Sequence, residues 1–476
     1  MAVPSWSDYS SIISQGLQPQ TAKPARVIVI GAGMAGLTAA YELQRAGHEP
    51  IILEAQERVG GRVHTLRDDF ASGLYGEAGA MRIPLAHALT MGYARHFGLR
   101  LLPFTFPNPR GYYYLFGRRL RMSFAEAHAD TLGFDVAVHE AGRTVSQLLE
   151  STLRPITQTL RREGEAAWPE LEAKCDRYST RGFLQANGWS DGAVEMFAVL
   201  LNQEALLDDS FLEFLREEMG ECYAGLHYIE GGMGRLPDAF LPALGQHIQL
   251  GARVVAIEQS ADAVTVYHER AGVPAQVKAD FAILTVPFSV LRRIEMLQPL
   301  SRGKQRAIRE LHYESSVKIF LQFRRRFWEE EEAIFGGQSI TDLPVRAIYY
   351  PDHGRETGRG VLLASYTWGE DAQRWAALAP NQRIQLALRD VSRIHPRAAE
   401  EFESGVSKVW QSDEFASGAF AELAPGQHSR LHEHITAPEG RLHFAGEHAS
   451  CLHAWIQGAI QSGLRAAREV HARTLA

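Results

Sequence analysis

The sequence predicts an α/β protein, and three features near its N-terminus support that fold class. Residues 26–30 form an apolar, β-branched run that is typical of a buried parallel strand. Gly31, Gly33 and Gly36 follow it in GxGxxG spacing, and a helical stretch then ends at Gly47. The next apolar strand ends on the acidic residue Glu54. Strand, turn, helix, strand and acid in this order predict a Rossmann-type unit that binds an adenine dinucleotide.

Each glycine of this motif has a physical role. The first permits the tight turn, the second lets the backbone approach a pyrophosphate, and the third lets the helix pack against the strand. The helix that follows the motif directs its N-terminal N–H groups and dipole at that phosphate. A GxGxxG motif alone is weak evidence, and the alternative is a strand–helix packing motif without a ligand.

Length and composition limit the class of protein. A chain of 476 residues exceeds the size of one hydrophobic core, so we expect two or three domains. The net charge of −7 gives no reason to expect binding to nucleic acid or to an anionic membrane. The three cysteines lie far apart, which argues against a disulfide framework or a zinc site and predicts no metal. Residues 1–8 lack a signal-peptide pattern, so we expect a cytoplasmic protein.

Two loops after the nucleotide-binding unit carry fixed cations in glycine-rich surroundings. Ala55 begins the first loop, which ends in Gly60-Gly61-Arg62 and suits close approach to a phosphate or flavin. The second runs from Gly76 to Pro84 and contains Arg82 among Gly, Ala and Met residues. Because an unpaired buried charge is costly, Arg82 is expected to bind an anion. The alternatives are an ordinary glycine loop for the first and, for Arg82, an ion pair with Glu77 or another acid.

The rest of the chain alternates between helical and β-rich patterns. Residues 119–220 have apolar positions at three- and four-residue spacing, which predicts a helical insertion. The strands expected at 248–257, 264–268 and 281–287 should rejoin the first sheet, which makes the dinucleotide domain discontinuous. A second β-rich region covers about 305–425 and places Lys318 in an apolar strand, either for function or for an ion pair. At the C-terminus a strand runs into Gly446-Glu447, and a small-residue helix begins after Trp455.

These motifs together resemble the flavin-containing amine oxidase family, and within it the L-amino-acid oxidases. The family resemblance rests on Glu54-Ala-x-x-Arg-x-Gly-Gly-Arg62, on Phe444-Ala-Gly-Glu447 and on the helix entered at Trp455. The resemblance to the L-amino-acid oxidases rests on the stretches 79–84, 312–321, 341–351 and 462–468. It implies an FAD cofactor, the amine-oxidase (GR2-like) fold and a homodimer or larger assembly. It also implies an FAD-binding domain (24–65, 225–305 and 425–472), a β-rich substrate-binding domain (1–23, 66–118 and 306–424) and a helical domain (119–224).

The resemblance further implies how FAD is bound. The three motif glycines meet the pyrophosphate, Glu54 the adenosine ribose, and Val254 the adenine through its backbone. Arg62 and the loop from Gly79 to Arg82 lie along the flavin, while Glu447 and the turn from Ala454 hold the ribityl chain. The implied cofactor residues are Gly31, Gly33, Met34, Ala35, Gly36, Glu54, Ala55, Gly61, Arg62, Gly79, Ala80, Met81, Arg82, Val254, Gly446, Glu447, Ala454, Trp455, Ile456 and Ala459.

The substrate residues implied by the resemblance are fewer. Arg82 and Tyr366 bind the substrate carboxylate, Trp455 forms a wall, and Lys318 holds a water near flavin N5. Arg216 and Trp368 are expected at the side-chain end of the pocket. Two positions depart from venom-type relatives, which have Gly at Ala454 and His at Arg216. Ala419 stands where monoamine oxidases attach flavin through Cys, which predicts non-covalent FAD.

The implied reaction is oxidative deamination of an L-amino acid to a 2-oxo acid, ammonia and hydrogen peroxide. It proceeds by hydride transfer from Cα to flavin N5 and reoxidation by O2. The alternatives are an amino-acid 2-monooxygenase, an amine oxidase for substrates without a carboxylate, and a flavin-binding scaffold without turnover. The preferred amino acid stays open: Glu218 and Glu221 near the pocket favour basic side chains, and an aromatic lining favours Phe, Tyr, Trp or Leu.

Overall fold

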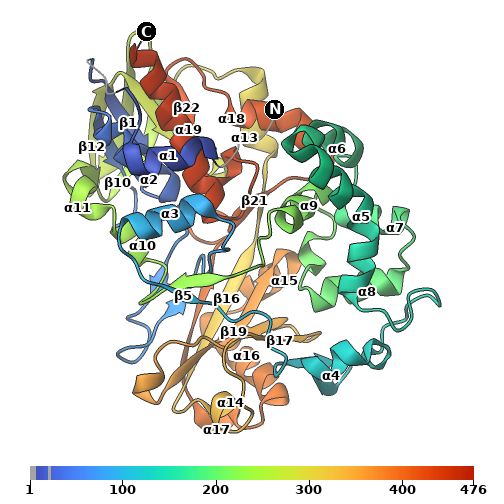
Figure 1. Cartoon of the computed structure of the whole chain (residues 1–476). Coiled ribbons are helices and arrows are strands. Elements are labelled where there is room, and N and C mark those ends of the chain that lie inside the picture. The colour runs from blue at the N-terminus through green and yellow to red at the C-terminus, as the bar shows by residue number, and fades with distance from the viewer. Residues whose placement is uncertain (1–6, 20–22, 476) are drawn as a thin grey trace.

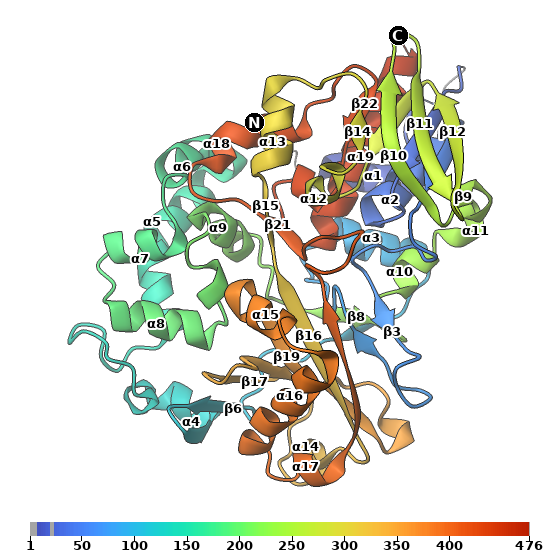
Figure 2. The ribbon, with the colours of Figure 1, turned by 180° about the vertical axis from the view of Figure 1, so that it is seen from behind.

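The computed structural model describes residues 7–19 and 23–475, which form three regions around a central cavity (Figure 1). A parallel sheet with its helices lies beside the C-terminus, a bundle of short helices lies to one side, and a large mixed sheet lies at the opposite end (Figures 1 and 2). Most of the N-terminal segment judged for a signal peptide, residues 1–6, lies outside the described residues. No described helix is long and apolar enough to cross a membrane.

The parallel sheet unites three distant parts of the sequence. Its order is β22 (Leu442–Phe444), β13 (Phe281–Leu284), β1 (Arg26–Ile30), β2 (Glu49–Leu53) and β9 (Ile248–Gln249), all parallel. Successive side chains of β1 point to opposite faces of the sheet, and both faces are buried. Val27 and Val29 pack in one core with α2 (Met34–Arg45) and α19 (Ile456–Leu475), whereas Ile28 and Ile30 pack in a second core. A strand buried on both faces explains the unbroken apolar run in the sequence.

The prediction for the later strands is confirmed for β9 and β13 and wrong for the other two. The strands β10 (Ala252–Gln259) and β11 (Val264–Arg270) form a separate sheet with β12 (Val273–Ala279) and β14 (Glu295–Met296). Val264 and Val266 are buried while the residues between them are less so, as expected for an antiparallel hairpin with one covered face. This sheet adds Ile257 and Val266 to the second core, against β1.

The helical insertion is confirmed. It contains α4 (Met122–Ala127), α5 (Val145–Glu163), α6 (Trp168–Cys175), α7 (Thr180–Ala186), α8 (Asp191–Leu200) and α9 (Phe211–Met219). Thr144 caps α5 in a capping box with Gln147, and Ser179 and Ser190 cap α7 and α8. The bundle has its own core around Phe183, Phe197 and Phe211. Only α9 of these helices brings residues to the cavity wall.

The second β-rich region forms a seven-stranded sheet. Its order is β20 (Phe402–Val409), β16 (Ser316–Phe323), β19 (Gly360–Trp368), β18 (Ala347–Tyr349), β17 (Gln338–Thr341), β6 (Tyr112–Leu115) and β7 (Arg118–Arg121). The helices α14 (Phe327–Glu330), α15 (Gly369–Ala376), α16 (Pro380–Ile394) and α17 (Ala398–Glu401) accompany it (Figure 2). In the antiparallel pair β16–β19, Lys318 lies opposite Tyr366 and Ser316 opposite Trp368. This register places Lys318 and both aromatic residues at one edge of the cavity.

Short elements complete the framework. The N-terminal helix α1 (Ser7–Gln15) packs on α3 (Ala88–His96) and buries Tyr9, Ile12 and Ile13. The pairs β3 (Thr65–Leu66) with β4 (Gly76–Glu77), β5 (Leu101–Pro103) with β8 (His227–Ile229), and β15 (His312–Glu314) with β21 (Phe420–Glu422) fix the loops around the cavity. The remaining helices are α10 (Arg235–Asp238), α11 (Leu241–Leu244), α12 (Phe288–Leu291), α13 (Arg302–Glu310) and α18 (Gln427–Thr436).

Candidate active site

A cavity of about 300 Å³ runs from the glycine turn after β1 to the edge of the seven-stranded sheet. All the site residues predicted from the sequence line it except Gly36 and Arg216. The structure therefore brings together segments from both ends of the chain, as the resemblance implies. The lining residues among those predicted are Gly31, Gly33, Met34, Ala35, Glu54, Ala55, Gly61, Arg62, Gly79, Ala80, Met81, Arg82, Val254, Lys318, Tyr366, Trp368, Gly446, Glu447, Ala454, Trp455, Ile456 and Ala459.

Two glycines of the turn have different roles that the GxGxxG spacing alone does not distinguish: Gly33 faces the cavity, and Gly36 packs the helix against the turn. Gly33 is the N-cap of α2, and a methyl group added there would meet no protein atom within 4 Å. It faces the open cavity at a helix N-terminus, where unsatisfied N–H groups favour an anion. A methyl group added at Gly36 would instead collide with the carbonyl oxygen of Gly31. Gly36 therefore packs the helix against the turn and does not line the cavity.

Glu54 lies buried at the end of β2, where backbone groups hold its carboxylate. The N–H of Ala32 donates to Oε2 (2.7 Å) and the N–H of Gln56 donates to Oε1 (2.9 Å). These bonds fix the carboxylate against the turn while it stays in the cavity wall. The geometry suits the role of binding hydroxyl groups that the sequence predicted for Glu54.

The opposite wall joins the loop that ends at Arg62 to the turn before the C-terminal helix. Arg62 donates from Nη1 to Glu447 Oε1 (2.8 Å) and to the carbonyl oxygen of Ala419 (3.0 Å). The other oxygen of Glu447 accepts from the N–H of Ala454 (3.0 Å). Ala454 adopts a left-handed conformation with φ of +63°, a region that favours glycine. The Gly-to-Ala departure at this position therefore places strain in the turn before α19.

Arg82 is half-buried among aromatic rings and forms no ion pair with a described residue. Its guanidinium carbon lies 5.1 Å from the ring centre of Phe106, 5.2 Å from that of Tyr223 and 6.0 Å from that of Tyr349. Nη1 is buried and has no hydrogen-bond partner among the described residues. A cation in this state is costly unless an anionic group binds it, so the site is built for an anion.

The alternative ion pair between Arg82 and Glu77 is not formed. The carboxylate of Glu77 accepts from the N–H of Met233 (2.8 Å) and from the hydroxyl of Thr65 (2.9 Å). Burial raises the pKa of Glu77 to about 7, against the effects of these hydrogen bonds and of Lys318. No described acid forms an ion pair with Arg82, and its side chain lines the cavity, where an anion can reach it.

Lys318 projects from β16 into the cavity wall and is only 1 % exposed. Its Nζ donates to the carbonyl oxygens of Glu77 (3.0 Å) and Gly79 (2.6 Å) and lies 4.4 Å from the ring centre of Tyr366. Burial lowers the pKa of Lys318 to about 7, and the charge of Arg82 acts in the same direction. Lys318 can therefore change protonation state near neutral pH.

Trp455 is joined to the helical region by a residue that the sequence analysis missed. Its Nε1 donates to Glu217 Oε1 (2.7 Å), and the hydroxyl of Tyr223 donates to Glu217 Oε2 (2.9 Å). The sequence analysis does not single out Glu217, yet this residue lines the cavity. Its three-residue spacing from the buried Phe214 is the signal that places it on the inner face of α9.

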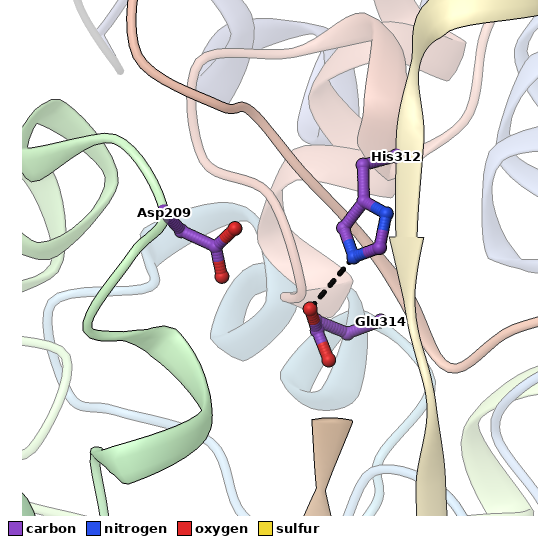
Figure 3. Close-up of side chains that lie close together, drawn as sticks. All are labelled: Asp209, His312 and Glu314. Carbon is purple, nitrogen blue, oxygen red and sulfur yellow. Dashed lines mark hydrogen bonds and ion pairs between the residues drawn. The ribbon is translucent and has the colours of Figure 1, made fainter. Parts of the chain in front are cut away.

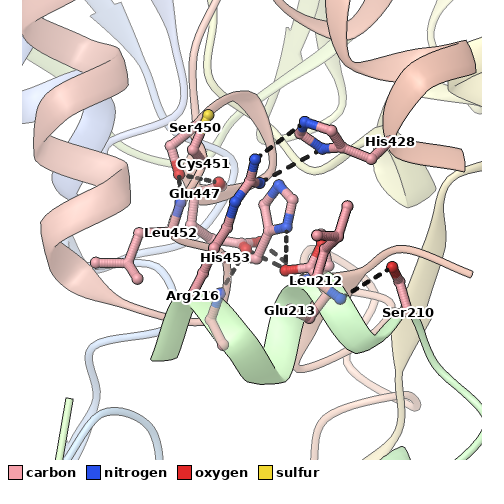
Figure 4. Close-up of polar contacts among 12 residues, drawn as sticks. Ser210, Leu212, Glu213, Arg216, His428, Glu447, Ser450, Cys451, Leu452 and His453 are labelled. Atoms are coloured by element: carbon pink, nitrogen blue, oxygen red, sulfur yellow. Dashed lines mark hydrogen bonds and ion pairs between the residues drawn. The ribbon is translucent and has the colours of Figure 1, made fainter. Parts of the chain in front are cut away.

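The placement of Arg216 at the side-chain end of the pocket is also wrong. Arg216 does not line the cavity, and its Nη2 donates to Glu172 Oε1 (2.6 Å) and approaches His428 Nε2 (3.0 Å). Figure 4 shows the Arg216 side chain directed at His428. The neighbouring Glu213 is hydrogen bonded through Oε2 to Nδ1 of His453 (2.8 Å). Helical periodicity turns successive residues to different faces, so α9 directs Arg216 into an ionic network and Glu217 into the cavity. Glu218 and Glu221 are also outside the cavity wall.

Sequence comparisons agree with this architecture. The profile of the flavin containing amine oxidoreductase family matches residues 34–471. YobN of Bacillus subtilis (strain 168), provisionally named an L-amino-acid oxidase, is 41% identical over 471 residues, which are 98% of this chain and 98% of that protein. An L-amino-acid oxidase of Vipera ammodytes ammodytes is 38% identical over 473 residues, which are 98% of this chain and 96% of that protein.

Solved structures show the same fold at lower identity. A variant of putrescine oxidase superposes with a TM-score of 0.74 at 20% identity, covering 95% of this chain and 99% of that one. Cyclohexylamine oxidase from Brevibacterium oxydans IH-35A gives a TM-score of 0.73 at 21% identity with the same coverage. The predicted α/β fold with a discontinuous nucleotide-binding domain is therefore that of the flavin amine oxidases. The chain belongs to the flavin-containing amine oxidoreductase family.

Proposed function

We propose that this chain is an FAD-dependent L-amino-acid oxidase. It converts an L-amino acid, O2 and water to a 2-oxo acid, ammonia and hydrogen peroxide. The observation that carries the proposal is the buried guanidinium of Arg82, which faces the cavity with Nη1 unpartnered among the described residues. A carboxylate satisfies such a guanidinium, and the curated relatives above carry the name of oxidases whose substrates have one.

Membership of the family assigns FAD as the cofactor, and the cavity fits it. Gly31, Gly33 and the start of α2 offer N–H groups for the pyrophosphate, and Glu54 offers a carboxylate for the ribose. Arg62 and Glu447 would hold the middle of the cofactor from the opposite wall. None of the three cysteines lines the cavity, which supports non-covalent binding. When bound, FAD accepts the hydride from the substrate Cα and passes the two electrons to O2.

Arg82 and Tyr366 orient the substrate in this proposal. Arg82 binds the carboxylate in a bidentate manner, and the Tyr366 hydroxyl donates to one of its oxygens. Both side chains line the same cavity. Fixing the carboxylate aligns the Cα–H bond for transfer, and such orientation contributes several kcal/mol to catalysis.

The amino group must be neutral before hydride leaves Cα. The walls formed by Trp455, Trp368 and Tyr223 exclude water, which favours the neutral amine. Backbone carbonyls of the turn at Ala454 and Trp455 accept its hydrogens. Lys318, with a pKa of about 7, holds a water beside the reacting centre and can supply or accept a proton during reaction with O2.

A peroxide-coupled screen of the twenty L-amino acids, with D-forms and simple amines, tests this proposal. We expect flavin-containing protein to produce one peroxide and one 2-oxo acid per L-amino acid consumed, and amines to be poor substrates. Amide with loss of CO2 would establish a 2-monooxygenase instead. A flavin that is not bleached by any amino acid without oxygen would identify a protein without turnover.

A further inference from the structure

Five acidic side chains line the cavity, and donors satisfy four of them. Backbone N–H groups hold Glu54, Arg62 holds Glu447, and Trp455 with Tyr223 holds Glu217. The partly exposed Glu414 pairs with Arg253 (2.9 Å). The fifth is Glu422, at the end of β21.

Glu422 is 8 % exposed, and no described residue donates a hydrogen bond to its carboxyl group or forms an ion pair with it. Its charged neighbours are acidic: Glu213, Asp209, Glu217 and Glu314. Burial and these neighbours raise the pKa of Glu422 well above its ordinary range. A cation that enters the cavity beside such a buried carboxyl group stabilises its ionised form.

The histidine that lies opposite Glu422 in the sheet does not form a hydrogen bond with its carboxyl group. His312 lies opposite Glu422 in the β15–β21 pair, but its Nε2 hydrogen bonds Glu314 Oε1 (2.7 Å). Figure 3 shows this pair together with Asp209, whose Oδ2 has no partner among the described residues. His312 therefore bonds Glu314, and it gives no hydrogen bond to Glu422.

An aromatic wall connects Glu422 to the Arg82 end of the cavity. The rings of Tyr366 and Trp368 lie 5.0 Å apart, and those of Trp368 and Phe420 lie 6.1 Å apart, each pair edge to face. All three line the cavity, as does Leu206. Methylene groups pack well against such a wall, and the strand β21 carries Phe420 and Glu422 on the same face.

We propose that the preferred substrates are L-amino acids with a cationic side chain, and that Glu422 binds that cation. The inference rests on the proposed function, since Arg82 must hold the substrate carboxylate at the other end. The methylene chain then lies along Tyr366, Trp368 and Phe420, and the terminal ammonium or guanidinium meets Glu422. Glu422 ionises as the cation arrives and becomes a specificity-determining residue.

Matched substrates test the proposal on the wild-type holoenzyme. L-arginine is compared with L-citrulline, and L-lysine with Nε-acetyl-L-lysine and L-norleucine, by peroxide formation. We expect kcat/KM to be at least about tenfold higher for each charged member. Neutral members that react as well as the charged ones would overturn the inference and leave the proposed function intact. Absence of turnover with all L-amino acids would instead refute the proposed function.

A substitution assigns the preference to one carboxylate. In Glu422→Gln, which keeps the shape, the ratio of kcat/KM for L-arginine to that for L-citrulline should fall at least about tenfold. The matched control is Glu218→Gln, because Glu218 is a half-buried acid of α9 outside the cavity wall whose pKa is likewise raised by burial, and it should keep the wild-type ratio. An unchanged ratio in Glu422→Gln would overturn the role of Glu422. Flavin absorbance verifies that each variant is folded holoenzyme, and the wild-type substrate series stands if one is not.

Discussion

Arg82, Lys318 and Glu422 are the ionisable side chains on which this account depends, and all three lie in the wall of one cavity. The sequence predicted the first two because a cation in an apolar segment needs an explanation. It could not predict which anion would meet Arg82, since the partner expected along the chain, Glu77, is occupied by Met233 and Thr65. Such choices depend on tertiary contacts that spacing along one segment does not encode.

Replacement of Lys318 by Met tests its role in the reaction with O2. Because burial lowers the pKa of Lys318 to about 7, the side chain is protonated below that pH and neutral above it. A positive charge stabilises negative charge developing on oxygen, so the wild-type reoxidation rate should be higher below pH 7 and fall above it. In Lys318→Met reoxidation should be at least about tenfold slower and lose this transition. Stopped-flow traces in which substrate reduction slows more than reoxidation would contradict the assignment.

At the scale of elements, two glycines at the start of α2 show how much of the structure a sequence pattern predicts. The GxGxxG spacing correctly predicts a strand, turn and helix, and only the structure separates Gly33, which faces the cavity, from Gly36, which packs against Gly31. Likewise, the periodicity of α9 predicts a helix, but the rotation that buries Arg216 in a network and presents Glu217 to the cavity depends on the partners Glu172 and Trp455.

Two alanine substitutions in α2 and its turn should have different effects, one on FAD binding and the other on stability. In Gly33→Ala the new methyl group meets no protein atom, so the apoprotein should keep its melting temperature while the FAD dissociation constant rises at least about tenfold. In Gly36→Ala the methyl group collides with the backbone of Gly31, and overpacking of this kind costs about 1–3 kcal/mol or more of stability. Calorimetry of the apoproteins and flavin titration separate the two. Equal loss of stability in both variants would contradict the distinction.

At the scale of the whole molecule, the sequence predicted the three regions better than their joints. The parallel sheet was predicted from continuous apolar strands, and β13 does pair with β1, while β22 pairs with β13 in the same sheet. The hairpin β10–β11 was placed in the wrong sheet, because a half-covered strand and a fully covered one contain similar residues until their partners are known. The predicted domain boundaries, homodimer or larger assembly, and cytoplasmic location stay predictions.

The joint between the helical region and the cavity should affect stability as a function of pH. Burial, and then the charge of Glu314, raises the pKa of Asp209 to about 7 from an ordinary value of 3.8. The folded state therefore binds more protons than the unfolded state between these values, so this group's contribution to stability falls as pH rises. Asp209→Asn should raise the melting temperature at pH 8 by about 2 °C or more, and the gain should shrink toward pH 5.

The control for Asp209 is its exposed neighbour Asp208, which pairs with Arg181 at the surface. Asp208→Asn should leave the difference between the melting temperatures at pH 8 and pH 5 unchanged. If Asp209→Asn behaved like this control, Asp209 would not be a protonated, buried group in the folded protein.

The central claim, that Arg82 binds the carboxylate of an α-amino acid, is tested most directly by Arg82→Ala with two substrates. One is the L-amino acid with the highest wild-type kcat/KM, and the other is the amine that lacks only its carboxylate. Loss of a buried bidentate contact should lower kcat/KM for the amino acid by about 30-fold or more, and the value for the amine much less, while FAD stays bound. An unchanged kcat/KM for the amino acid, or an equal loss for both substrates, would contradict the account.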